Sequence, residues 1–132
     1  MLEHDDDDRY MTRAIFEEND YPVALQFVDN SNDLFAHLLS CEKQLAPLPA
    51  VILLTHNAMP SNAVEILDTL KSDRRFCHIP VVVLSGTMNE ETLKRCYEAG
   101  ANSFIRKPVS SRETSRKISD FFRYWFQTVE LP

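Results

Sequence analysis

The stretch from Pro80 to Pro108 constrains the fold more than any other part of the chain. It opens with the apolar run Val81–Leu84, which is typical of a strand buried on both faces, as in a parallel sheet. Apolar residues then recur at helical spacing up to Gly100, a natural helix end. A second short strand, Ser103–Arg106, ends before Lys107-Pro108. A strand, a helix and another strand in succession predict a right-handed parallel crossover.

The same alternation of strands and helices extends along the rest of the chain. Apolar runs predict two more strands, and apolar residues at i, i+3, i+4 and i+7 predict the helices. The expected strands are Val23–Val28 and Ala50–Leu54; the expected helices are Asp8–Asn19, a helix from Asn30 or Ser31 to Cys41, Asn62–Asp73, a helix from Thr87 or Asn89 to Gly100, and Val109–Pro132. Alternating elements over 132 residues predict a single α/β domain, residues 1–132, with helices on both faces of the sheet.

Composition excludes several classes of function. The net charge of −6 argues against a face that binds nucleic acid through phosphate contacts. The three cysteines are odd in number and show no metal-ligand spacing, which predicts a reducing cytoplasm. No apolar run approaches membrane-spanning length. With two glycines there is no glycine-rich phosphate loop, and no Ser-His-Asp or Cys-His spacing stands out, so we expect no enzyme activity.

Four features of the Pro80–Pro108 stretch carry a family resemblance. They are Ser85 after the apolar run, the turn Glu98–Asn102, Phe104 in the second strand, and Lys107-Pro108. At these spacings the stretch resembles the receiver domain of two-component response regulators. The resemblance implies a flavodoxin-like, doubly wound parallel sheet of five strands in the order 2-1-3-4-5.

The resemblance also implies roles for three of these residues. Ser85 and Lys107 would contact phosphoryl oxygens, and Phe104 would move with them. Purely structural roles are the alternative: Phe104 fills the sheet face, and Lys107 pairs with an acid such as Asp5.

The N-terminus departs from the family pattern. Only two residues precede the acidic turn, so either the sequence lacks its native start or the central first strand is vestigial. The two acidic positions of the family fall at Glu3 and His4, and Asp5 adjoins them. The run Asp5–Asp8 also suits a solvated helix start, where negative charge is favourable.

The phosphoacceptor position also departs from the pattern. In the family an Asp at the end of the third strand takes the phosphoryl group and binds Mg²⁺. Counting back from Met59-Pro60 places this position at His56, whereas counting forward from Pro49 places it at Thr55. Imidazole is a poor Mg²⁺ ligand, and Thr55 would give a phosphate ester too stable for a fast switch. His56 also suits a loop residue that only makes a hydrogen bond.

The resemblance therefore favours a degenerate receiver that needs no cofactor, has lost Mg²⁺ binding, and acts by binding a histidine kinase or a downstream effector. Two alternatives stay open: phosphorylation on His56 or Thr55, and a small-ligand or enzymatic domain on the same fold.

The last helix carries more apolar surface than docking on a sheet requires. The short first strand also leaves the second and third strands in need of a neighbour. Both observations predict a homodimer whose candidate interface residues are Phe122, Trp125, Phe126 and Val129. The alternatives are a thicker core and a monomer whose upstream residues are missing from this sequence.

Overall fold

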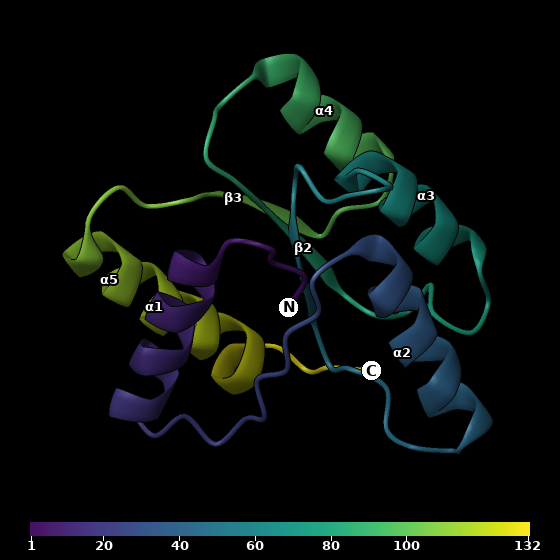
Figure 1. Cartoon of the computed structure of the whole chain (residues 1–132), viewed down its shortest axis with the longest axis horizontal. Helices are drawn as coiled ribbons and strands as arrows, with labels where there is room; N and C mark the ends of the chain where they lie inside the picture. The colour runs from purple at the N-terminus through teal and green to yellow at the C-terminus, as the bar shows by residue number, and fades with distance from the viewer.

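A computed structural model describes all residues from 1 to 132 as three layers. A central parallel sheet separates two groups of helices (Figure 1). Helices α1 (Asp6–Glu18) and α5 (Ser111–Phe122) lie together on one side. On the other side lie α2 (Ser31–Lys43), α3 (Ala63–Ser72) and α4 (Glu90–Glu98). None of these helices is both long and apolar enough to cross a membrane.

The regular sheet has three strands, not five. β1 (Ile52–Thr55), β2 (Val81–Ser85) and β3 (Ser103–Arg106) are parallel and lie in the order β1-β2-β3. Beyond β1, Leu2 forms one parallel bridge to Leu54 and another to Val28. The spatial order Val28, Leu2, β1, β2, β3 is the order 2-1-3-4-5, with the first two strands reduced to single bridges.

The prediction of a regular strand over Val23–Val28 was wrong. Residues 24 to 27 donate no backbone hydrogen bond to another backbone group. A strand needs a neighbour for its N–H and C=O groups, and the only distant backbone that pairs with this segment is that of the first three residues. Between it and residues 47–53 lies a cavity of about 370 Å³ with a mostly apolar lining.

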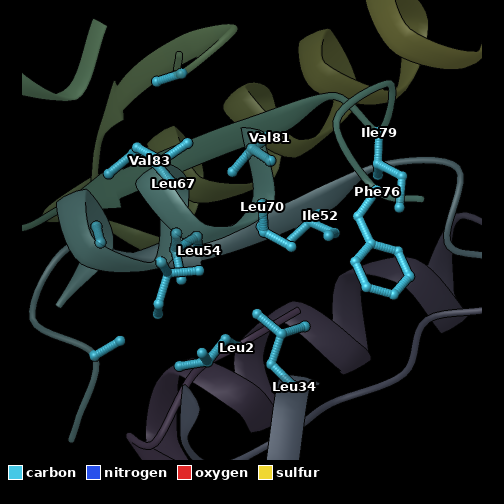
Figure 2. Close-up of a cluster of buried hydrophobic side chains, with 14 of the residues drawn as sticks. Leu2, Leu34, Ile52, Leu54, Leu67, Leu70, Phe76, Ile79, Val81 and Val83 are labelled. Carbon is cyan, nitrogen blue, oxygen red and sulfur yellow. The ribbon is translucent and has the colours of Figure 1, made fainter. Parts of the chain in front are cut away.

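Alternation along the strands sorts the apolar side chains between the two faces. Ile52, Leu54, Val81 and Val83 point to the α2–α3 side, where they pack with Leu34, Leu67 and Leu70 and with Leu2 (Figure 2). Successive strand residues point to opposite faces, so Leu53, Leu84 and Ile105 face α1 and α5 instead. β2 is buried almost throughout, as its apolar run predicted.

Most predicted helix ends agree with the structure within one or two residues. Asn62 and Glu65 form a reciprocal capping box at α3, and Ser110 caps α5. Helix α4 begins after Asn89, whose side chain accepts from the Thr92 N–H, and this settles the choice between Asn89 and Thr87.

The expectation that one regular helix runs from Val109 to Pro132 was wrong. Helix α5 ends at Phe122, and a π-helical turn, η1 (Arg123–Thr128), follows it. The Val129 N–H donates to Tyr124 O, the i to i−5 bond that defines this wider turn. Phe122 stacks between Tyr21 and Phe126, with ring centroids 4.3 Å and 5.5 Å apart, so aromatic packing accompanies the change of helix type.

Side chains from two helices cover the outer side of β3. The Phe104 N–H donates to the Tyr97 hydroxyl of α4 over 3.2 Å. Lys117 of α5 donates to Arg106 O over 2.6 Å and also pairs with Glu113. Both backbone groups point away from β2 and are thereby satisfied.

Candidate functional site

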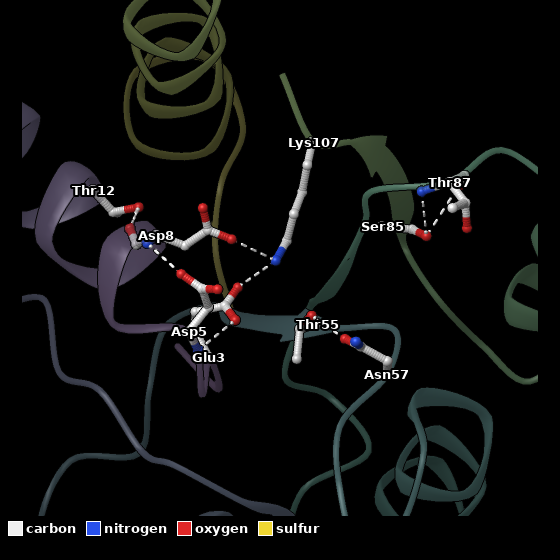
Figure 3. A network of polar contacts seen from close by, with 9 residues as sticks. All are labelled: Glu3, Asp5, Asp8, Thr12, Thr55, Asn57, Ser85, Thr87 and Lys107. Atoms are coloured by element: carbon white, nitrogen blue, oxygen red, sulfur yellow. Dashed lines mark hydrogen bonds and ion pairs between the residues drawn. The ribbon is translucent and has the colours of Figure 1, made fainter. Parts of the chain in front are cut away.

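Polar side chains gather where the parallel strands end at their carboxyl side (Figure 3). Glu3 follows the Leu2 bridge, Thr55 ends β1, Ser85 ends β2, and Lys107 follows β3. This edge is where ligands bind in open α/β sheets. The structure thus brings together residues from four separate parts of the sequence.

The centre of the site is an ion-paired group that we call the Lys107 cluster: Glu3, Asp8 and Lys107. The Lys107 Nζ donates to Glu3 Oε2 over 2.6 Å and to Asp8 Oδ2 over 2.9 Å (Figure 3). Glu3 is 0% exposed, and its other oxygen accepts from the Asp5 N–H over 3.1 Å. A buried carboxylate is strongly unfavourable unless it is paired and hydrogen-bonded, and Lys107 supplies that pairing.

Two opposing effects act on the pKa of Lys107. Burial lowers the pKa, whereas the hydrogen bonds and charges of Glu3 and Asp8 raise it; together they hold the pKa above its ordinary value of 10.5. Lys107 is therefore fully charged at neutral pH, and two carboxylates already occupy two of its three donor hydrogens.

The pairing of Lys107 with Asp5 is a prediction that the structure corrects. Asp5 is the N-cap of α1, and its Oδ1 accepts from the Asp8 N–H over 2.9 Å. One helical turn on, Asp8 is the residue that reaches Lys107. The sequence could not single out Asp8, because it stands in a run of four identical side chains. His4 is exposed and lies outside the cluster.

Neither candidate for the phosphoacceptor is a carboxylate in the structure. Thr55 ends β1, is 1% exposed, and donates through Oγ1 to Asn57 Oδ1 over 2.9 Å. His56 follows the strand, is half-buried, and donates its backbone N–H to Leu84 O over 2.7 Å. Asn57, which the sequence reading missed, is the partner that holds the Thr55 hydroxyl.

These residues do not fit a magnesium site. The hard cation Mg²⁺ needs several oxygen ligands, mostly carboxylate and water, in octahedral geometry. The Asp5 side chain caps a helix and the carboxylates of Glu3 and Asp8 pair with Lys107. No group of three or more His, Cys, Asp or Glu side chains is placed to hold a metal ion.

Ser85 and Phe104 lie outside the cluster. The Ser85 Oγ donates to Thr87 O over 2.9 Å and accepts from the Thr87 N–H over 3.3 Å (Figure 3). Its hydroxyl is therefore occupied by its own loop. Phe104 is half-buried and packs against the hydrophobic core, which is the structural role considered for it.

The four candidate interface residues divide into two pairs. Phe122 and Trp125 are 6% and 8% exposed within a single chain, so they offer little surface to a second copy. Their burial is a correction to the expectation that both lie on an interface; the cause is the aromatic packing of Tyr21 and Phe121 against them. Phe126 and Val129 are only partly buried.

Known proteins resemble this chain over nearly all of its length. Residues 2–119 match the response regulator receiver domain family. The response regulator Rcp1 of Synechocystis is 30% identical over 91 residues, which is 69% of this chain and 62% of Rcp1. A probable methanogenesis regulatory protein, FilR2 of Methanothrix harundinacea, is 32% identical over 78 residues, 59% of this chain and 50% of FilR2. These matches thus span about half to three fifths of the relatives' own lengths.

Solved structures agree with this assignment. The phosphorylated cyanobacterial phytochrome response regulator RcpA superposes with a TM-score of 0.89 and 26% identity, over 99% of this chain and 94% of RcpA. The bacteriophytochrome response regulator AtBRR has a TM-score of 0.71 and 28% identity, over 90% of this chain and 87% of AtBRR. The family match covers residues 2–119, and the strand order and the positions of Ser85, Phe104 and Lys107 agree with it. The chain therefore belongs to the response regulator receiver domain family of two-component signalling.

Proposed function

We propose that this receiver has lost the transfer of a phosphoryl group to aspartate and acts, without enzyme activity, by binding another signalling protein. The observation that carries the proposal is the end of β1, where Thr55 and His56 stand and no carboxylate follows Leu54. A carboxylate is needed both to attack phosphorus and to ligate the hard metal ion that neutralises the charge. The Lys107 cluster supports the same proposal. The charge of Lys107, which would otherwise contact a phosphoryl group, is already neutralised by the carboxylates of Glu3 and Asp8.

The binding surface we propose lies over α4, β3 and the start of α5. Three large apolar side chains are exposed there: Met88 at 57%, Tyr97 at 48% and Val109 at 93%. Large apolar side chains exposed on neighbouring elements are available to a partner. The partner we propose is a histidine kinase or a downstream effector, and the likeness to phytochrome response regulators supports a kinase of the phytochrome type.

The first test measures phosphoryl transfer. Incubation with radiolabelled acetyl phosphate or an autophosphorylated histidine kinase should leave the protein unlabelled, with or without Mg²⁺. Label that is lost in acid and abolished by His56→Ala would overturn the proposal in favour of a phosphohistidine. Of the two candidate acceptors, His56 is the one with an accessible side chain, because Thr55 is buried and hydrogen-bonded.

The second test measures partner binding. Val109→Asp places a charge on the proposed surface and should weaken binding to the kinase or effector at least about tenfold, the scale of a disrupted hot spot. Leu45→Asp is the matched control, because Leu45 is also 93% exposed but lies just after the C-cap of α2, on another part of the molecule. Equal losses in both variants would contradict the proposed surface.

The Ser85→Ala variant asks whether a switch is still in use. Without a phosphoryl group for Ser85 to contact, the variant should leave partner affinity within about twofold, provided that the protein stays folded. A large loss in a folded variant would show that the Ser85 hydroxyl still controls the surface.

A homodimer is a separate proposal, now supported only by the part-exposed Phe126 and Val129. Light scattering over a dilution series should show a dimer that Phe126→Asp dissociates. A monomer at high concentration, unchanged by that substitution, would end the idea.

A further inference from the structure

A cavity of about 160 Å³ lies between α1, α5 and the sheet, next to the Lys107 cluster. Its apolar walls come from Met11 and Phe16 of α1 and from Ile118 and Phe121 of α5. Its floor is formed by the strand residues Leu53, Leu84 and Ile105, and its polar end by Glu3, Asp8 and Lys107. An engineered apolar cavity of about 150 Å³ binds benzene, so this one has room for a single ring.

The polar end carries net negative charge. Glu3 and Asp8 contribute two negative charges and Lys107 one positive charge, which leaves −1. Lys117 also lines the cavity, but its charge is offset by its partner Glu113 over 3.4 Å. A ligand with a positive charge would complement this end, whereas a carboxylate would be repelled.

Hydrogen-bonding capacity agrees with the charge. The Asp8 Oδ2 accepts from Lys107, whereas its Oδ1 makes no hydrogen bond within the chain. Burial and the nearby Arg9 lower the pKa of the Met1 amino group to about 6, so that group adds little positive charge at neutral pH. One Lys107 N–H and the Asp8 Oδ1 therefore remain at this end, and the net charge of −1 favours a cationic donor over an anionic acceptor.

We propose that this cavity binds a small amphipathic amine, with an aromatic or ring-sized apolar body between α1 and α5 and its ammonium group beside Asp8. No covalent step is involved, and the binding does not depend on the proposed partner surface over α4 and β3. The cavity would make the chain responsive to a small molecule through Glu3 and Lys107, two groups at the carboxyl end of the sheet.

The test uses phenethylamine as the probe and NMR titration of the full chain as the measurement. Saturable shifts should appear at Met11, Ile118 and Phe121, with a dissociation constant on the order of 1 mM, as expected for a ligand of this size. Ethylbenzene should bind more weakly and 3-phenylpropionate most weakly. Equal or tighter binding of the carboxylate, or no saturable shift at the cavity, would overturn the proposal.

Two pairs of variants locate the site. Asp8→Asn should weaken phenethylamine binding about fivefold, the effect of one partly exposed charge-assisted hydrogen bond, while Asp7→Asn on the exposed side of α1 should not. Ile118→Trp should fill the cavity and abolish binding, while Ser115→Trp on the exposed side of α5 should leave it unchanged. Retained binding in a folded Ile118→Trp variant would place the ligand elsewhere and overturn the proposal.

Discussion

The sheet has two halves, one on each side of β1, which carry similar apolar sequences but differ in how much regular strand they form. From β1 to β3, each neighbouring pair of strands shares a register of four residues, with helices on both faces. On the other side of β1 the sheet continues only through Leu2, which bridges Leu54 and Val28. The apolar pattern of Val23–Val28 is as good as that of the regular strands, yet its backbone is mostly unpaired. A β pattern in the sequence becomes a strand only where a neighbouring backbone is present.

Hydrogen exchange should show the largest difference between the halves. We expect the Val83 amide to exchange only on global unfolding, and the Gln26 amide to exchange from the native state. For a domain of ordinary stability these rates differ by at least about three orders of magnitude. Exchange resolved by residue with NMR measures this directly; similar protection at both amides would show that the N-terminal half is as cooperative as the rest.

Truncation of a leucine to alanine should lower the free energy of unfolding by different amounts in the two halves. Leu67→Ala removes a fully buried side chain from the core on the α3 side and should destabilise the protein by about 3 kcal/mol. Leu25→Ala, at a half-buried position beside the unfilled cavity, should cost less than about 1 kcal/mol. Denaturant unfolding compares the two free energies, and equal costs would contradict the distinction.

Lys107 connects the two halves, because it follows β3 and binds Glu3 next to Leu2. Lys107→Met would leave the buried Glu3 carboxylate unpaired, and we expect a loss of about 2 kcal/mol, less than for a fully buried pair because Lys107 is 23% exposed. The pKa of Lys107 is raised in the folded state, so its stabilisation is complete below the ordinary pKa of 10.5 and is lost as the pH rises through the folded value.

Unfolding measured against pH tests this assignment. The wild type should lose its advantage over Lys107→Met above about pH 10.5, where the unfolded lysine deprotonates first. Asp7→Asn serves as a control with no ion pair to lose. A stability difference between wild type and Lys107→Met that stays constant up to pH 12 would contradict the assigned role of Lys107.

Local signals predicted the local structure well. The helix expected at Asn62–Asp73 and the strand expected at Ser103–Arg106 depend on residues a few positions apart, and the structure confirms both within one residue. The π-helical turn after Phe122 was missed, because it is accompanied by packing against Tyr21, a residue about 100 positions away.

The site was predictable in position more than in contacts. The sequence placed Glu3, Thr55, Ser85 and Lys107, which do lie at the same edge of the sheet. It gave Lys107 the wrong partner, because the pairs with Glu3 and Asp8 span 104 and 99 residues and no local pattern reports them. Such contacts follow from the topology, in which the carboxyl ends of parallel strands meet.

The side chains that cover β3 have a consequence for solubility. A strand with a free outer side is a template on which a second molecule can add its own strand, the first step toward aggregation. Here the Tyr97 hydroxyl occupies the outward N–H of Phe104, and the Lys117 side chain occupies the outward carbonyl of Arg106. The edge of the sheet beyond β1 is incompletely paired, whereas the opposite edge, at β3, is protected by two side chains from separate helices.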